Sequence, residues 1–152
     1  MPMGSEQGLR LSVALSLDWE MAMLSGSRVL VVEDEAITAE EIRLLLIEAE
    51  GVPVGPVASL SEARRLLKDG TPVDAALLDV NVSDGTITPV LEALSARGIP
   101  ALVYTGGSLP ADVRQRHPDL IALSKPVAPA RLIAELRRLT GKLGSPTQLA
   151  SH

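Results

Sequence analysis

The sequence predicts an α/β fold, in which a doubly wound parallel sheet of five strands has helices on both faces. Short β-branched runs alternate with longer segments whose apolar residues recur every three or four positions, and this alternation favours a parallel sheet. Right-handed crossovers then leave few topologies, of which the strand order 2-1-3-4-5 is one of the commonest. Hydrophobic residues make up 46% of the chain, with no Phe, one Tyr and one Trp. The core is therefore predicted to be aliphatic.

Five apolar runs are predicted to be the strands. The first is apolar without a break from Val29 to Val32, which is typical of a strand buried on both faces. Pro56 places the second strand at an edge of the sheet, because proline cannot donate a ladder hydrogen bond. The predicted strands cover residues 28–33, 54–58, 73–80, 100–105 and 120–124.

A helix is predicted after each strand, from the apolar stripes at helical spacing. Gly51 is predicted to end the first helix. Ser59 and Glu62 have the spacing of a capping box at the start of the second. Asp84 is interpreted as part of a turn before the third helix, and the fourth is a short helix around residues 110–116.

The two ends of the chain differ from the predicted domain, residues 28–140. Residues 1–27 form an N-terminal extension in which apolar residues alternate with mostly polar or small ones, a pattern that fits a strand and also one helical face. This arm either folds back on the domain, is untranslated if Met21 or Met23 is the natural start, or serves oligomerisation or docking. Residues 141–152 are expected to form a flexible tail with no output domain attached.

Composition and charge exclude several classes of function. A net charge of -5 without a lysine-rich block argues against nucleic-acid binding. The absence of cysteine excludes disulfides, thiolate catalysis and the usual zinc sites. No run reaches the roughly 18 uninterrupted apolar residues of a membrane span, and no export signal is recognised. We therefore expect a cytoplasmic protein with neither nucleic acid nor membrane as its partner.

Polar side chains follow the predicted strands at one edge of the sheet. In open parallel sheets, ligands bind beyond the carboxyl ends of the strands, near the point where the strand order reverses. We expect five side chains from four strands to converge there, namely Glu33, Asp34, Asp79, Thr105 and Lys125.

Three converging carboxylates indicate a site for a hard divalent cation, because they would otherwise repel one another. Mg²⁺ prefers carboxylate, carbonyl and water oxygens. Asp34 and Asp79 could bind it directly and Glu33 through water. The backbone carbonyl of Asn81 could supply a further ligand.

The same residues are suited to phosphoryl transfer. With its charge compensated, the Asp79 carboxylate can attack an electrophilic phosphorus and form an aspartyl phosphate. Charge on the transferred oxygens needs fixed donors and cations. Lys125 can pair with one of these oxygens, and the Thr105 hydroxyl can donate to another.

Four motifs, VLVVEDE, LLDVNVSDG, YTGG and SKP, stand in this order at the predicted strand ends. Together they resemble the receiver domain of bacterial two-component response regulators, over residues 28 to about 140. The resemblance implies a CheY-like, flavodoxin-like fold. It makes Asp79 the phosphoacceptor, Glu33 and Asp34 the acidic pair for Mg²⁺, and Asn81 the carbonyl ligand.

The resemblance also implies roles for the other strand ends and for partners. Thr105 becomes the switch hydroxyl and Lys125 the lysine of the site, with a cis bond before Pro126, where cis is accessible. The phosphoryl group would come from a sensor histidine kinase or phosphotransfer protein, and the signal would reach an unidentified target protein. The domain would be no enzyme beyond catalysing its own phosphorylation and dephosphorylation. Homodimer formation is left open.

The sequence departs from many receivers three positions before the lysine, where Ala122 replaces an aromatic residue. Readout of phosphorylation would therefore not use the common coupling between threonine and an aromatic ring. The segment IPALVYTGG resembles the FATGUY subgroup of single-domain receivers, although Gly107 stands where that motif has an aromatic.

Two other functions share features with the receiver. A phosphatase of the haloacid-dehalogenase type also forms an aspartyl phosphate, but it needs an acid two residues after the nucleophile, where this chain has Asn81. A pseudo-receiver would bind a partner without phosphorylation, and retention of all the site residues argues against it.

Overall fold

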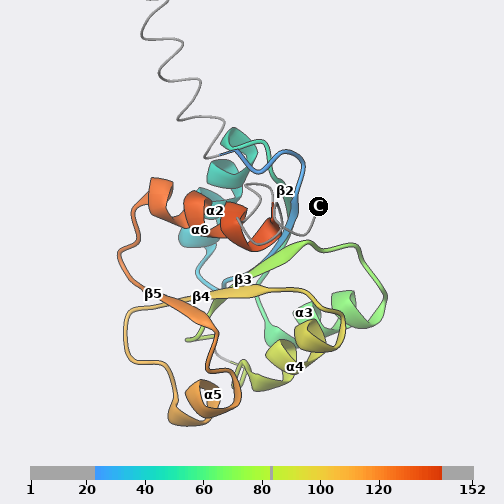
Figure 1. Cartoon of the computed structure of the whole chain (residues 1–152), viewed down its shortest axis with the longest axis vertical. Helices are drawn as coiled ribbons and strands as arrows, with labels where there is room; N and C mark the ends of the chain where they lie inside the picture. The colour runs from blue at the N-terminus through green and yellow to red at the C-terminus, as the bar shows by residue number, and fades with distance from the viewer. Residues whose placement is uncertain (1–22, 83, 142–152) are drawn as a thin grey trace, which may run out of the picture.

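The computed structural model of this protein describes residues 23–82 and 84–141. Most of the predicted N-terminal arm and C-terminal tail lie outside the described residues, and the boundaries at residues 28 and 140 stay predictions. The described body is a three-layer arrangement in which a central sheet lies between two groups of helices (Figure 1).

The sheet confirms the predicted fold class. It is five-stranded and parallel, in the order β2-β1-β3-β4-β5. Its strands are β1 (Arg28–Val32), β2 (Val52–Val57), β3 (Ala75–Asp79), β4 (Ala101–Thr105) and β5 (Ile121–Ser124). The order reverses between β1 and β3, so the functional edge predicted from the sequence lies at the carboxyl ends of these two central strands.

One helix follows each strand. The helices are α2 (Ala36–Glu48), α3 (Leu60–Lys68), α4 (Thr88–Ala96), α5 (Ala111–Arg116) and α6 (Pro129–Thr140). Figure 1 shows α2 and α6 on one face of the sheet, with α3, α4 and α5 on the other. Within the described residues, no helix is both long and apolar enough to cross a bilayer.

The hydrophobic core consists of two clusters, one on each face of the sheet. Because successive side chains of a strand point to opposite faces, Val31 and Leu77 pack with α2 and α6. Val32 and Leu78 pack with α3 and α4. All four side chains are fully buried, so the central strands are fixed from both sides, as their uninterrupted apolar runs predicted.

The edge strand β2 begins two residues earlier than predicted. The N–H of Val52 donates to the carbonyl of Ser27 at 2.8 Å, which draws it into the sheet. Further along, the register between β1 and β2 shifts between Leu30 and Val32. Pro56 lies in this strand at the edge of the sheet, as predicted.

Gly51 allows Leu24 to pack closely against the end of helix α2. Helix α2 ends at Glu48, and the residue with a left-handed backbone is Glu50, whose φ is 62°. A Cβ atom on Gly51 would lie 2.7 Å from Cδ1 of Leu24. Leu24 is fully buried, and its N–H donates to the carbonyl of Ala49 at 2.7 Å, so the packed body includes a residue upstream of the predicted boundary.

The start of α3 is capped from two directions. The Ser59 hydroxyl accepts the N–H of Glu62 at 3.1 Å, as the capping motif predicted. The carboxylate of Asp84 accepts the N–H groups of Leu60 and Ser61 at 2.9 and 3.2 Å, and the first of these bonds is the main cause of its lowered pKa. Asp84 therefore ties the loop after β3 to α3, a role that its interpretation as a turn residue missed.

We predict that Leu24→Ala destabilises the domain by about 2–5 kcal/mol, because it leaves a cavity against Ala49 and Gly51. Urea unfolding followed by circular dichroism measures the change. Ile37→Ala is the matched control, since Ile37 is 74% exposed and truncation should change stability by less than about 0.5 kcal/mol. Equal, small effects of the two substitutions would show that Leu24 contributes no packing energy.

Candidate functional site

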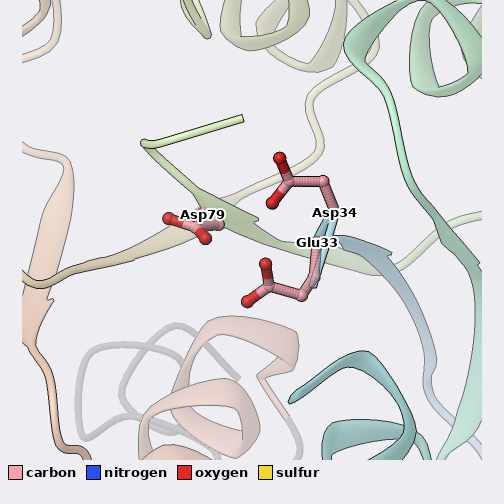
Figure 2. Close-up of side chains that lie close together, drawn as sticks. All are labelled: Glu33, Asp34 and Asp79. Atoms are coloured by element: carbon pink, nitrogen blue, oxygen red, sulfur yellow. The ribbon is translucent and has the colours of Figure 1, made fainter. Parts of the chain in front are cut away.

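Three carboxylates meet at the predicted edge of the sheet. Glu33 and Asp34 follow β1, and Asp79 ends β3 (Figure 2). One oxygen from each lies within 4.8 Å of the others. Glu33 and Asp79 are only 2% and 3% exposed, whereas Asp34 is exposed. The structure thus brings together the acidic groups that the sequence predicted.

Lys125 supplies a positive charge to this cluster. Its Nζ lies 3.2 Å from Oδ2 of Asp79 and 3.8 Å from Oε1 of Glu33. In the described part of the chain, it is the one cation within salt-bridge distance of either buried carboxylate. Three negative charges against one positive charge leave an excess that favours binding of a cation.

Backbone N–H groups also bind the two buried carboxylates, Asp79 and Glu33. The N–H of Asn81 donates to Oδ1 of Asp79 at 2.9 Å, and the N–H of Glu35 donates to Oε2 of Glu33 at 3.1 Å. Each bond comes from the residue two positions further along the chain. The strand ends therefore fix both the position and the orientation of these side chains.

Sequence reasoning did not assign Tyr104 to the site. Its buried hydroxyl donates to Oε1 of Glu33 at 2.6 Å, and the centre of its ring lies 4.7 Å from Nζ of Lys125. The signal that could have placed it there is its position along the strand. Tyr104 pairs with Asp79 in the sheet, and paired residues of neighbouring strands point to the same face. A buried tyrosine at that place needs a hydrogen-bond partner.

Thr105 ends the same strand but points to the opposite face. It is 4% exposed, and its hydroxyl oxygen accepts the N–H of Gly107 at 3.1 Å. The described contacts do not join it to Asp79. A cavity of about 460 Å³ lies beside it, lined also by Ala122 and His117, on the side where many receivers have an aromatic ring.

Burial dominates the electrostatics of Glu33. Removal from water raises the pKa of its carboxyl group, and the neighbouring Asp79 adds to this rise. The hydrogen bonds from Tyr104 and from the N–H of Glu35 oppose it. Burial and the adjacent Glu33 also raise the pKa of the Tyr104 hydroxyl, which therefore keeps its proton and remains a donor.

Comparison with solved structures identifies the fold. A response regulator receiver protein from Sinorhizobium medicae is 24% identical, with a TM-score of 0.69 over 78% of this chain and 97% of that one. SdrG from Sphingomonas melonis Fr1 is 36% identical, with a TM-score of 0.63 over 77% of this chain and 98% of SdrG. The chain belongs to the receiver domains of response regulators. No family model and no curated protein matches the sequence.

A further similar structure is a receiver domain that contains a metal ion. It belongs to a sensor histidine kinase from Pseudomonas aeruginosa PAO1 and was solved with a magnesium ion coordinated in its active-site cleft. It is 24% identical, with a TM-score of 0.66 over 76% of this chain and 98% of that domain. In the present receiver, Glu33, Asp34 and Asp79 form a cluster that could bind a metal. Membership of the FATGUY subgroup stays a prediction.

We predict that the metal-free receiver loses stability relative to Glu33→Gln as pH rises. The folded state raises the pKa of Glu33 above its ordinary value of 4.5, so it holds this proton more strongly than the unfolded chain does. The resulting stabilisation is complete below pH 4.5 and is lost as pH rises through the raised pKa. The glutamine cannot ionise and escapes this loss.

Thermal unfolding in EDTA from pH 4 to 8 measures the difference between the two proteins. Glu92→Gln, at a residue whose carboxylate makes an exposed ion pair with Arg116, controls for removal of one acid. A gap between wild type and Glu33→Gln that stays constant across this range would contradict the prediction.

Proposed function

We propose that this receiver accepts a phosphoryl group on Asp79, with Mg²⁺ bound, from a sensor histidine kinase or a phosphotransfer protein. One observation carries the proposal: a 3% exposed carboxylate at the end of a central strand lies both in an acidic cluster and 3.2 Å from a lysine. Signalling by contact with a target protein in the cytoplasm belongs to the same proposal.

Asp79 is distinguished from the other two acids by its surroundings. Glu33 is engaged at both oxygens, by the Tyr104 hydroxyl and the Glu35 N–H. Asp34 is exposed at the start of a loop. In Asp79, by contrast, one oxygen accepts the N–H of Asn81, and the other contacts the flexible side chain of Lys125. It is the carboxylate best placed to exchange its partner for a phosphoryl group.

The donor set fits Mg²⁺. Hard cations of this kind bind carboxylate and carbonyl oxygens, and the clustered carboxylates carry more charge than Lys125 compensates. Asp34 and Asp79 would hold the ion directly, Glu33 through water, and the Asn81 carbonyl would add a ligand. When bound, the ion would neutralise negative charge on the reacting oxygens.

The transfer itself uses the residues of the chain. A carboxylate oxygen of Asp79 forms a bond to phosphorus while the P–N bond of the donor phosphohistidine breaks, and the electron pair leaves on the ring nitrogen. Lys125 pairs with one phosphoryl oxygen. The Thr105 hydroxyl, whose oxygen accepts the N–H of Gly107, keeps its own proton and would donate it to another phosphoryl oxygen once its side chain turns toward Asp79.

We predict that incubation with Mg²⁺ and acetyl phosphate adds the mass of one phosphoryl group to the intact protein. Asp79→Asn should abolish the increment, because an amide cannot act as this nucleophile. Asp119→Asn removes an exposed carboxylate outside the cluster and should leave the increment unchanged. Intact-mass spectrometry over time measures all three proteins.

The same experiment separates the alternatives. Continuous release of inorganic phosphate without any accumulated mass increment would favour a phosphatase of the haloacid-dehalogenase type, although Asn81 occupies the place of its acid. No increment with acetyl phosphate or a phosphorylated kinase would favour a pseudo-receiver.

We also predict that Mg²⁺ stabilises the folded protein. A ligand at 100 times its Kd stabilises by about 2.7 kcal/mol when it binds only the folded state. The stabilisation should shrink as pH falls through the raised pKa of Glu33, because protons compete for the same carboxylates. Thermal unfolding with and without Mg²⁺, at matched ionic strength, measures it. Asp34→Asn should weaken it, and Asp119→Asn should not.

A further inference from the structure

Tyr104 contacts two charged groups of the site at once. It is 4% exposed and lies in the core cluster that packs against α2 and α6. Its hydroxyl reaches Oε1 of Glu33, and its ring faces Nζ of Lys125. These partners come from opposite sides of β4: Glu33 follows β1, and Lys125 follows β5. Tyr104 therefore links the ends of three strands.

The hydroxyl completes the orientation of Glu33. A hydrogen bond of 2.6 Å from O–H to a carboxylate has the length of a charge-assisted bond. It holds Oε1, while the N–H of Glu35 holds Oε2 at 3.1 Å. With both oxygens fixed, the carboxylate cannot turn away from Asp79. Phenylalanine would fill the same space but would leave Oε1 with only Lys125, at 3.8 Å.

The ring limits the positions open to Lys125. Its ammonium lies 4.7 Å from the ring centre, within the range of a cation–π interaction, and 3.2 Å from Asp79. The side chain is 34% exposed, so without the ring the flexible stem could extend into solvent. The ring face and the carboxylate together keep the ammonium at the edge of the cluster.

We propose that Tyr104 is a positioning residue of the site, which holds Glu33 through its hydroxyl and Lys125 through its ring. This inference rests on the proposed function, because the two groups are positioned for a metal and a phosphoryl group. Groups that orient metal ligands from behind commonly change metal affinity 10–100-fold when removed. A tyrosine that served packing alone would have no such effect.

The first test compares Mg²⁺ affinity by isothermal titration calorimetry. Tyr104→Phe keeps the ring and its contact with Lys125 but removes the hydroxyl, and we expect its Kd to rise several-fold, because Glu33 would hold the ion through water. Thr88→Val is the matched control, because Thr88 is 9% exposed and its hydroxyl has no hydrogen-bond partner among the described residues. Its Kd should equal that of wild type.

A double-mutant cycle separates positioning from packing. In a Glu33→Ala background both acceptor oxygens are already lost, so adding Tyr104→Phe should weaken Mg²⁺ binding by less than about twofold. Non-additivity of this kind is the signature of two groups that act as a unit. If Tyr104→Phe costs as much in this background as in wild type, its effect does not pass through Glu33 and the inference is wrong.

A metal-free measurement reads the geometry directly. Amide hydrogen exchange of Glu35, whose N–H donates to Glu33, should be several-fold faster in Tyr104→Phe. Exchange of Asn81, whose N–H donates to Asp79, should stay unchanged. Exchange that is equal in both proteins at Glu35 would overturn the inference.

The outcomes distinguish the inference from the proposed function. If wild type binds Mg²⁺ and Tyr104→Phe binds it equally well, Tyr104 does not position Glu33 and only the inference fails. If wild type binds no Mg²⁺, the proposed function fails and takes the role of Tyr104 toward the metal with it. The Asp79-dependent mass increment reports on the proposed function independently.

Discussion

Two buried carboxylates share one ammonium group, and the arrangement of the site depends on this imbalance. Glu33 and Asp79 are almost inaccessible to water, where an unpaired charge costs several kcal/mol. Lys125 compensates only part of their charge, and the rest is met by hydrogen bonds from Tyr104, Glu35 and Asn81. A rigid support is needed to hold like charges together. The two central strands, buried from both faces, provide it.

The fold was predictable because the apolar pattern of each segment agrees with the place of that segment in the sheet or on its faces. Short uninterrupted apolar runs are typical of strands covered on both faces, and helical stripes between them favour parallel pairing. The carboxyl ends of parallel strands share an edge, so the residues that end them could be brought together without knowledge of any contact. Glu33, Asp34, Asp79 and Lys125 were found in this way, and the structure brings them together.

The features that sequence reasoning missed depend on contacts between distant residues. Leu24 packs against Gly51, so a Cβ atom at that position would make the leucine side chain shift, a steric effect that no local pattern reveals. Asp84 caps a helix that begins 24 residues earlier in the chain, and Tyr104 bonds to a carboxylate 71 residues away. In each case the residue type fits its local position equally well without the contact. Strand parity would have placed Tyr104 on the correct face, but its partner depends on the order of the strands.

The near absence of aromatic residues has a practical consequence. The chain has one tyrosine and no phenylalanine, and that tyrosine contacts both Glu33 of the acidic cluster and Lys125. A single set of tyrosine ring signals in a nuclear magnetic resonance spectrum therefore belongs to this place and needs no assignment by mutagenesis. The receiver carries a built-in spectroscopic probe, and ligands, partners or modifications that alter the site can be followed in the unlabelled wild-type protein.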